Sequence, residues 1–231
     1  MAARGGQQRI PRPDSARPGD PAPWAGLDPA QRRFTVDDVR RACAALPAPR
    51  HGPTPATARP AAVLVPVRDD DGDAAIVLTK RPETMPSHQG EIAFPGGKFD
   101  PDLDRSLADT ARREAHEEIG LDPDRVELVA ELDALTTVAA RFVLTPFVGL
   151  LTDPVRLHPH PTEVVRVFTV PISELLADGV YREERWDVPA GLGVTPGRGR
   201  PIHFYELADE TVWGATARIL TDLLSHLTGP R

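Results

Sequence analysis

The sequence has 231 residues, a hydrophobic content of 40%, a charged content of 26% and a net charge of −7. That length suffices for one sizeable core or a modest pair of domains. The acidic balance argues against a general nucleic-acid binder or a binder of acidic membranes, because both need a basic face. No apolar run could span a bilayer, no secretory signal is visible, and the single cysteine, Cys43, excludes an intramolecular disulfide. We therefore expect a cytoplasmic protein without nucleic-acid or membrane partners. The oligomeric state stays open, a homodimer included.

The first 60 residues are rich in proline. Residues 1–33 show no apolar period, which predicts a disordered leader. In 34–60 the pattern predicts a short helix from Thr35 to Leu46, with Asp38 placed for a capping box, followed by a Pro-rich linker. We expect one further domain, over residues 61–231.

The main body is predicted to contain more strands than helices. The apolar runs 61–67 and 74–80 flank the acidic turn DDDGD and predict a hairpin with Gly72 in the turn. Further strands are predicted at 92–94, 126–132, 142–151, 164–170 and 202–207, and helices at 105–119, 172–176 and 212–227. The mixed order favours an α/β fold, with a mixed β-sheet sandwiched between helices, over an all-parallel sheet.

Three carboxylates gather at the predicted C-terminal end of the helix 105–119. Glu114, Glu117 and Glu118 stand at i, i+3 and i+4, so they share one helical face, and Gly120 is placed to end the helix. Anions are disfavoured at a helix C-terminus and repel one another at this spacing. A solvated acidic face is the ordinary alternative, but the cost at this position favours a site that holds a hard divalent cation, Mg2+ or Mn2+, through oxygen ligands.

The same residues carry a family resemblance. Segment 97–121 resembles the Nudix box, whose centre is R-E-x-x-E-E-x-G and an apolar residue. The matching residues are Arg113, Glu114, Glu117, Glu118, Gly120 and Leu121. The box usually has a Glu eight residues before its Arg, where this sequence has Arg105. Asp104 is the nearest acid, and we do not carry the first box Glu over.

The segment before the box sharpens the resemblance. Residues 78–97 are similar to the corresponding stretch of the coenzyme A diphosphatases, with L-T-x-R, a later Gly and F-P-G-G at the same spacing, and with Pro86 in place of a second Arg. The resemblance implies a Nudix fold and metal-dependent hydrolysis of a diphosphate linkage in a small nucleoside diphosphate substrate. Coenzyme A or acyl-CoA would give 3′,5′-ADP and the 4′-phosphopantetheine half.

Residue roles follow from the resemblance and from the chemistry of diphosphates. The expected metal ligands are Glu114, Glu117, Glu118 and a backbone carbonyl at Gly97. The candidate catalytic residues are Glu117, Glu118, Arg113 and Glu163. A box carboxylate is our preferred base and Glu163 its alternative, while Arg113 is expected to orient a carboxylate. The candidate phosphate-binding cations are Arg81, Lys80, Lys98 and Arg141.

Two other functions stay open from the sequence. One is the same hydrolysis on another nucleoside diphosphate derivative, such as ADP-ribose or a dinucleotide. The other is a Nudix-fold module that binds a nucleotide without cleaving it. Such modules typically lose box carboxylates, so the three that are present here favour an enzyme.

Overall fold

The computed structural model describes residues 4–52, 56–85, 88–137, 142–152, 155–187 and 199–229. The chain divides into two compact units, Arg33–Ile172 and the pair of segments Met1–Arg32 with Ser173–Arg231. Within the described ranges, no helix is both long and apolar enough to cross a membrane. Each unit has its own sheet and its own helices.

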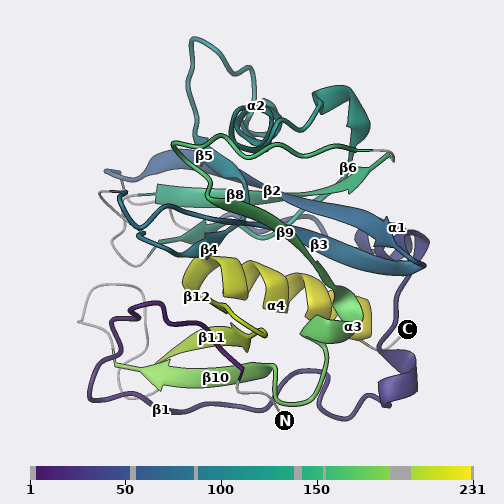
Figure 1. Ribbon diagram of the computed structural model, residues 1–231, viewed down its shortest axis with the longest axis vertical. Helices are drawn as coiled ribbons and strands as arrows, with labels where there is room; N and C mark the ends of the chain where they lie inside the picture. Colours follow the sequence, from purple (N-terminus) through teal and green to yellow (C-terminus); the bar gives the residue numbers. More distant parts are fainter. Residues whose placement is uncertain are drawn as a thin grey trace. The chain divides into compact units, whose positions relative to one another are not determined.

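The unit Arg33–Ile172 is built on a mixed sheet with the strand order β4-β3-β2-β8-β6 (Figure 1). Strand β5 adds to β2, β7 to β8 and β9 to β3. The pair β2–β8 is parallel and the other pairs are antiparallel, so the predicted mixed sheet is confirmed. The strands are β2 (Arg59–Asp70), β3 (Asp73–Lys80), β4 (Ile92–Ala93), β5 (Gly96–Lys98), β6 (Val126–Glu131), β7 (Leu135–Thr136), β8 (Phe142–Leu151) and β9 (Arg166–Pro171).

Helices α1 (Val36–Ala44) and α2 (Leu107–Ile119) pack against this sheet, and a short 3-10 helix, η2 (Pro123–Arg125), follows α2. The predicted capping box of α1 is present, because Thr35 and Asp38 each accept a hydrogen bond from the other's backbone N–H. Cys43 is buried on the apolar face of α1, as the apolar stripe predicts, and burial raises the pKa of its thiol to about 11.

Helix α2 packs on β2 and β5, and Figure 1 shows it lying across one face of the sheet. The core beneath it is aliphatic apart from one aromatic ring. Its buried residues include Ala62, Leu64, Val77, Ala111, Ala115, Ile119, Leu121 and Phe147. This packing holds α2 by its apolar face, while Glu114 and Glu118 lie along the edge of that face next to β5 and Glu117 is exposed.

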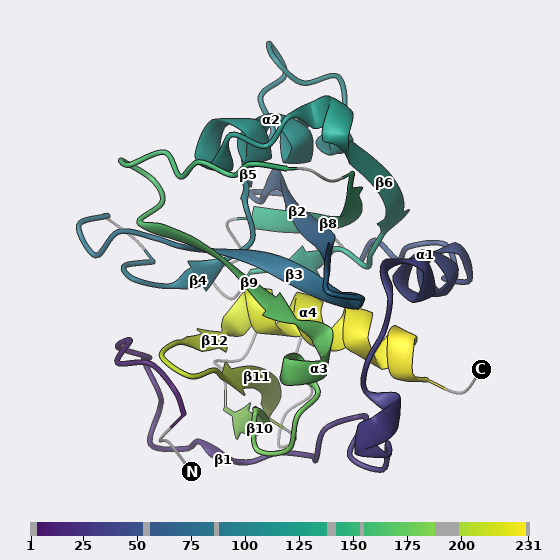
Figure 2. The same ribbon diagram turned by 45° about the vertical axis from the view of Figure 1, so that its right-hand side comes forward.

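The second unit has a four-stranded antiparallel sheet in the order β1-β10-β11-β12 (Figure 2). Helix α4 packs on β11 and β12 through buried aliphatic residues such as Leu220 and Leu224. The elements are β1 (Arg17–Pro18), η1 (Pro29–Gln31), β10 (Tyr181–Trp186), β11 (Arg200–Glu206), β12 (Thr211–Trp213) and α4 (Gly214–Thr228). The short helix α3 (Ile172–Leu175) begins at the last residue of the first unit.

The expected disorder of residues 1–33 is not what the structure shows for residues 4–32. Strand β1 pairs with β10, and Trp24 is only 4% exposed, with its ring 5.2 Å from that of Tyr181. The backbone N–H of Gly5 donates to the carbonyl of Leu207. Composition was misleading because this segment finds its partners on a sheet edge formed far along the chain, and one buried tryptophan does not produce a periodic pattern.

The expected single domain over 61–231 also differs from this division, since β2 begins at Arg59 and the chain after Ile172 groups with its own N-terminal segment. Strand β10, YREERW, was not predicted. Four of its six residues are charged, and they pair with one another and with the N-terminal segment instead of facing water alone.

Candidate active site

Local sequence signals set both ends of α2. Ser106 caps the N-terminus by accepting the backbone N–H of Asp109. Gly120 ends the helix with φ +65°, the left-handed conformation that favours glycine. Both signals were visible in the sequence, and the helix begins two residues later than the predicted residue 105.

A loop from further along the chain completes the C-terminal end of α2. The backbone N–H groups of His158 and His160 donate to the carbonyls of Ile119 and Glu118, each at 2.8 Å. These bonds supply donors to carbonyls that have no hydrogen-bond partner within the helix at its C-terminal end. The HPHP motif therefore acts through its backbone, and both histidine side chains are exposed. The same loop continues directly to Glu163.

Arg113 connects the carboxylates around α2. Its Nε and Nη2 donate to the two carboxylate oxygens of Asp104 at 2.8 and 2.9 Å, and its Nη1 lies 3.0 Å from both Glu114 and Glu117. The bonds from Arg113 lower the pKa of the buried Asp104 to about 2. Sequence reasoning noted Asp104 only as the nearest acid, because nothing in the spacing showed that it would meet Arg113.

Glu118 is the most buried of the three box carboxylates, at 4% exposure. One oxygen accepts the backbone N–H of Gly96 at 3.2 Å, and the other lies 3.8 Å from Nη1 of Arg81. Burial raises its pKa to about 7, against those two contacts and with the charges of Glu114 and Glu163. The pKa of Glu114 is also raised, first by burial and then by nearby carboxylates.

Strand β5 approaches α2 too closely for a side chain at Gly97. A Cβ there would lie 2.4 Å from the carboxylate carbon of Glu114. Glycine at this position therefore leaves room for the Glu114 carboxylate directly against the backbone of β5. The Gly96 N–H thus contacts Glu118, and the Gly97 backbone lies against Glu114 on the same side of β5.

The donor set suits a hard divalent cation. Glu114 and Glu118 are carboxylates whose pKa values are raised chiefly by burial, and oxygen ligands of this kind hold Mg2+ or Mn2+. In the described part of the chain, no three His, Cys, Asp or Glu side chains already converge as a metal cluster. The guanidinium of Arg113 instead holds Glu114 and Glu117.

The proposed phosphate-binding cations are distributed unevenly. Arg81 lies at the site, beside Glu118, and within the described residues its Nε has no hydrogen-bond partner. Lys80 is the last residue of β3 and its carbonyl accepts the N–H of Val165. Lys98 is exposed and reaches toward the ring of Phe142 at 5.8 Å, and strand alternation points it away from the Gly97 side. Arg141 lies outside the described residues, as does Pro86.

Glu163 is exposed on the loop that caps α2. Its negative charge contributes to the raised pKa values of both Glu114 and Glu118. The structure therefore brings Glu114, Glu117, Glu118, Arg113, Gly97, Arg81 and Glu163 together around one end of α2, all within the unit Arg33–Ile172.

Comparisons with known proteins found relatives of this chain. The sequence model of the NUDIX domain matches residues 58–192. A Photorhabdus laumondii protein named uncharacterized Nudix hydrolase NudL is 37% identical over 169 residues, which cover 73% of this chain and 85% of that protein. Nudix hydrolase 22, chloroplastic, from Arabidopsis thaliana is 39% identical over 167 residues, covering 69% of this chain and 52% of its own length. A solved Nudix hydrolase from M. smegmatis, RenU, is 21% identical with a TM-score of 0.42 over 49% of this chain and 70% of its own.

Proposed function

The chain belongs to the Nudix family of hydrolases, and from this premise we propose that it hydrolyses the diphosphate linkage of coenzyme A or an acyl derivative. The observation that carries hydrolysis at this site is Glu118, a buried carboxylate with one backbone donor and an arginine 3.8 Å away. Such a group is costly to keep unless a cation or a reacting proton uses it.

We infer that Glu114, Glu117 and Glu118, with a carbonyl of Gly97, hold Mg2+ or Mn2+. When bound, the cation offsets charge on the diphosphate and lowers the pKa of a bound water. The carboxylates of Glu114 and Glu117 now rest on Arg113, and they would turn from this guanidinium toward the ion. Asp104 accepts two hydrogen bonds from that guanidinium, so Arg113 would stay in place when Glu114 and Glu117 turn toward the ion.

The general base in this proposal is a box carboxylate, Glu117 or Glu118, and Glu163 is the alternative. Burial supports Glu118, because its pKa of about 7 suits proton acceptance near neutral pH. Glu163 is exposed on the loop that backbone hydrogen bonds hold against the end of α2. As the alternative base, it would act on the bound water from the side of that loop.

Arg81 is the first candidate to bind the substrate diphosphate. It lies 3.8 Å from Glu118, and a guanidinium suits bidentate contact with phosphate. Lys80, Lys98 and Arg141 are further candidates from the sequence. The geometry of Lys98, which reaches toward Phe142, gives it the weakest support of the described ones.

The coenzyme A specificity rests on the segment 78–97, which is similar to that of coenzyme A diphosphatases. A substrate panel tests it directly. Purified protein with Mg2+ would be incubated with coenzyme A, ADP-ribose and NADH, and products would be separated and identified. We expect 3′,5′-ADP and 4′-phosphopantetheine from coenzyme A, in the highest yield of the three. Equal or faster turnover of ADP-ribose would replace coenzyme A by another nucleoside diphosphate derivative, and tight nucleotide binding without turnover would show a binding module.

A further inference from the structure

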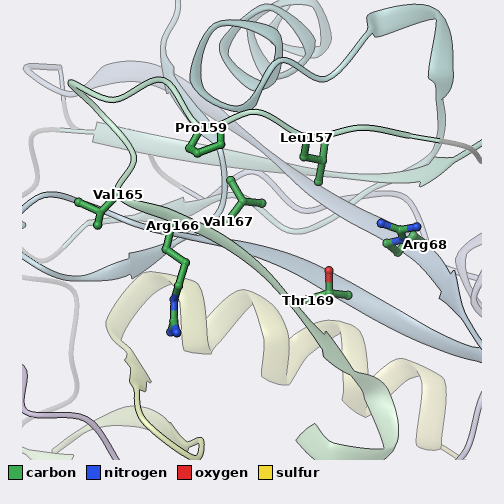
Figure 3. Close-up of a pocket in the computed structure, with 7 residues that line it drawn as sticks. All are labelled: Arg68, Leu157, Pro159, Val165, Arg166, Val167 and Thr169. Atoms are coloured by element: carbon green, nitrogen blue, oxygen red, sulfur yellow. The ribbon is translucent and has the colours of Figure 1, made fainter.

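A pocket of about 440 Å³ opens along β9, next to the site described above. Figure 3 shows Val165 at one end and Arg68 at the other. The walls come from the α2-capping loop, from β9 and from the end of β2. The pocket is lined by Arg68, Leu157, Pro159, Val165, Arg166, Val167 and Thr169.

The Val165 end of the pocket adjoins the catalytic carboxylates. Val165 follows Glu163 by two residues, and its N–H donates to the carbonyl of Lys80 at 2.8 Å, directly before Arg81. From there β9 runs along β3 toward Ala75, the residue that pairs with Pro171. The stretch from Val165 to Thr169 spans about 13 Å at strand rise. The pocket is therefore a groove that leads away from the site.

The chemistry of the walls selects a class of ligand. Val165, Val167 and Thr169 alternate onto the pocket side, whereas Arg166 points away from the other labelled side chains in Figure 3. Val165 is 60% exposed and is, with Leu103, one of two large hydrophobic residues exposed in the described ranges. Among the residues that the structure describes, no aromatic ring lines the pocket, so they offer no platform on which a base would stack. Aliphatic side chains beside a hydroxyl, backbone groups and, at the far end, the Arg68 side chain suit a slender chain that carries methyl and polar amide groups.

We propose that this groove binds the non-nucleotide arm of the substrate, an extended aliphatic and amide chain attached to the diphosphate. This inference rests on the proposed function and adds where the 4′-phosphopantetheine half lies. The diphosphate sits between α2 and Arg81, and the arm passes Val165 and follows β9 toward Thr169. Substrates with such an arm are then preferred over dinucleotides, because a second base finds no ring to stack on.

The test is a series at one exposed position, Val165→Ala and Val165→Trp. The tryptophan fills the groove at its entrance, and the exposure of Val165 makes room for it without disturbing the core. Two substrates are compared, coenzyme A and the β-methyl ester of 3′-phospho-ADP, which keeps the nucleotide and the diphosphate but has one carbon for an arm. We expect Val165→Trp to lower kcat/KM for coenzyme A at least about tenfold and to change that for the methyl ester less than about twofold.

A binding measurement gives a readout apart from turnover. Calorimetry with 4′-phosphopantetheine should show weaker binding to Val165→Trp than to the wild type, while binding of 3′,5′-ADP stays the same. The matched control is Leu103→Trp, the same change at the other exposed aliphatic residue, which lies outside the groove. It should alter neither substrate.

The outcomes separate the two proposals. If the wild type cleaves coenzyme A and Val165→Trp slows both substrates equally, or neither, the groove does not bind the arm and the proposed function stands. If the wild type cleaves no coenzyme A, the proposed specificity fails and this inference fails with it.

Discussion

Two buried glutamates, one in each unit, have opposite surroundings. Glu118 on α2 and Glu184 on β10 are 4% and 7% exposed. Glu184 accepts bonds from Arg12 at 2.8 Å and Trp186 at 2.7 Å, and pairs with Arg182. Burial alone would raise its pKa, but these donors and charges outweigh burial and lower it. Glu118 has one backbone N–H and an arginine at 3.8 Å, and its pKa rises to about 7.

The difference distinguishes a carboxylate that stabilises a fold from one kept for chemistry. Glu184 ties the N-terminal segment to the sheet through fully used oxygens, so its charge is compensated within the protein. Glu118 lies beside Glu114 and near Glu163, and burial raises its pKa by more than Gly96 and Arg81 lower it. Similar surface exposure thus has opposite meanings, and the depth of the carboxylate in the protein together with its partners decides which.

Exchanging Glu118 for Gln tests the functional half of this comparison and has the largest expected effect. Glu118→Gln should lower kcat for coenzyme A by about 10²–10³-fold, because a charge needed at the reacting centre is lost. The free energy of unfolding at pH 8 should not fall, since a poorly compensated buried charge is removed. The control is Glu184→Gln, which should keep full kcat. Equal kcat in Glu118→Gln and the wild type would remove Glu118 from the mechanism.

His203, on β11, extends the comparison to a buried base. Burial and the charges of Arg218 and Arg185 lower its pKa to about 4, and Tyr181 and Glu183 also face it. The unfolded chain binds a proton at about pH 6.5, where the native state does not. Its contribution to stability is therefore lost as pH falls from 6.5 to about 4, by up to about 3 kcal/mol.

Urea unfolding at pH 7 and pH 5 measures this effect, with His203→Gln as the reference that has no titrating ring. The wild type should lose more free energy of unfolding over that interval than the variant. Identical losses would show that His203 takes up its proton equally in both states.

The structural half of the comparison is tested by stability. Glu184→Gln should lower the free energy of unfolding by about 2 kcal/mol, because Arg12 and Trp186 lose a charged acceptor in a buried position. The loss of stability is limited because the Arg12 side chain is half-exposed, so water can partly replace its contact with Glu184. Asp124→Ala, an exposed carboxylate on η2, should change stability by less than about 0.5 kcal/mol. A loss no larger than this control would make the Glu184 contacts dispensable.

The smallest expected effect concerns the backbone beside Glu114. In Gly97→Ala the new Cβ would meet the Glu114 carboxylate, whose flexible side chain would move aside. Folding should survive, while Mn2+ affinity, followed by calorimetry, should fall about tenfold. Gly26→Ala adds the same methyl group where nothing lies within 4 Å, and should bind Mn2+ as the wild type does. Unchanged affinity in Gly97→Ala would place the ion away from Glu114.

Local sequence determined much of the first unit. Contacts between near neighbours in sequence set the caps at Thr35 and Ser106, the turn at Gly72 and the helix end at Gly120. A few consecutive residues therefore suffice to predict each of them. The spacing of Glu114, Glu117 and Glu118 likewise follows from helical geometry alone. The family follows from the same residues, because the box is one continuous segment.

Tertiary structure decided what depends on residues far apart in the chain. Asp104 met Arg113, the loop at His158–His160 capped α2, and Arg81 came to lie beside Glu118 only when β3, β5 and α2 packed together. The N-terminal segment found order on β10, about 170 residues later. A sequence pattern reflects the geometry of a single helix or strand. The burial and the pKa of a side chain depend instead on which other elements pack around it, and tertiary packing decides that.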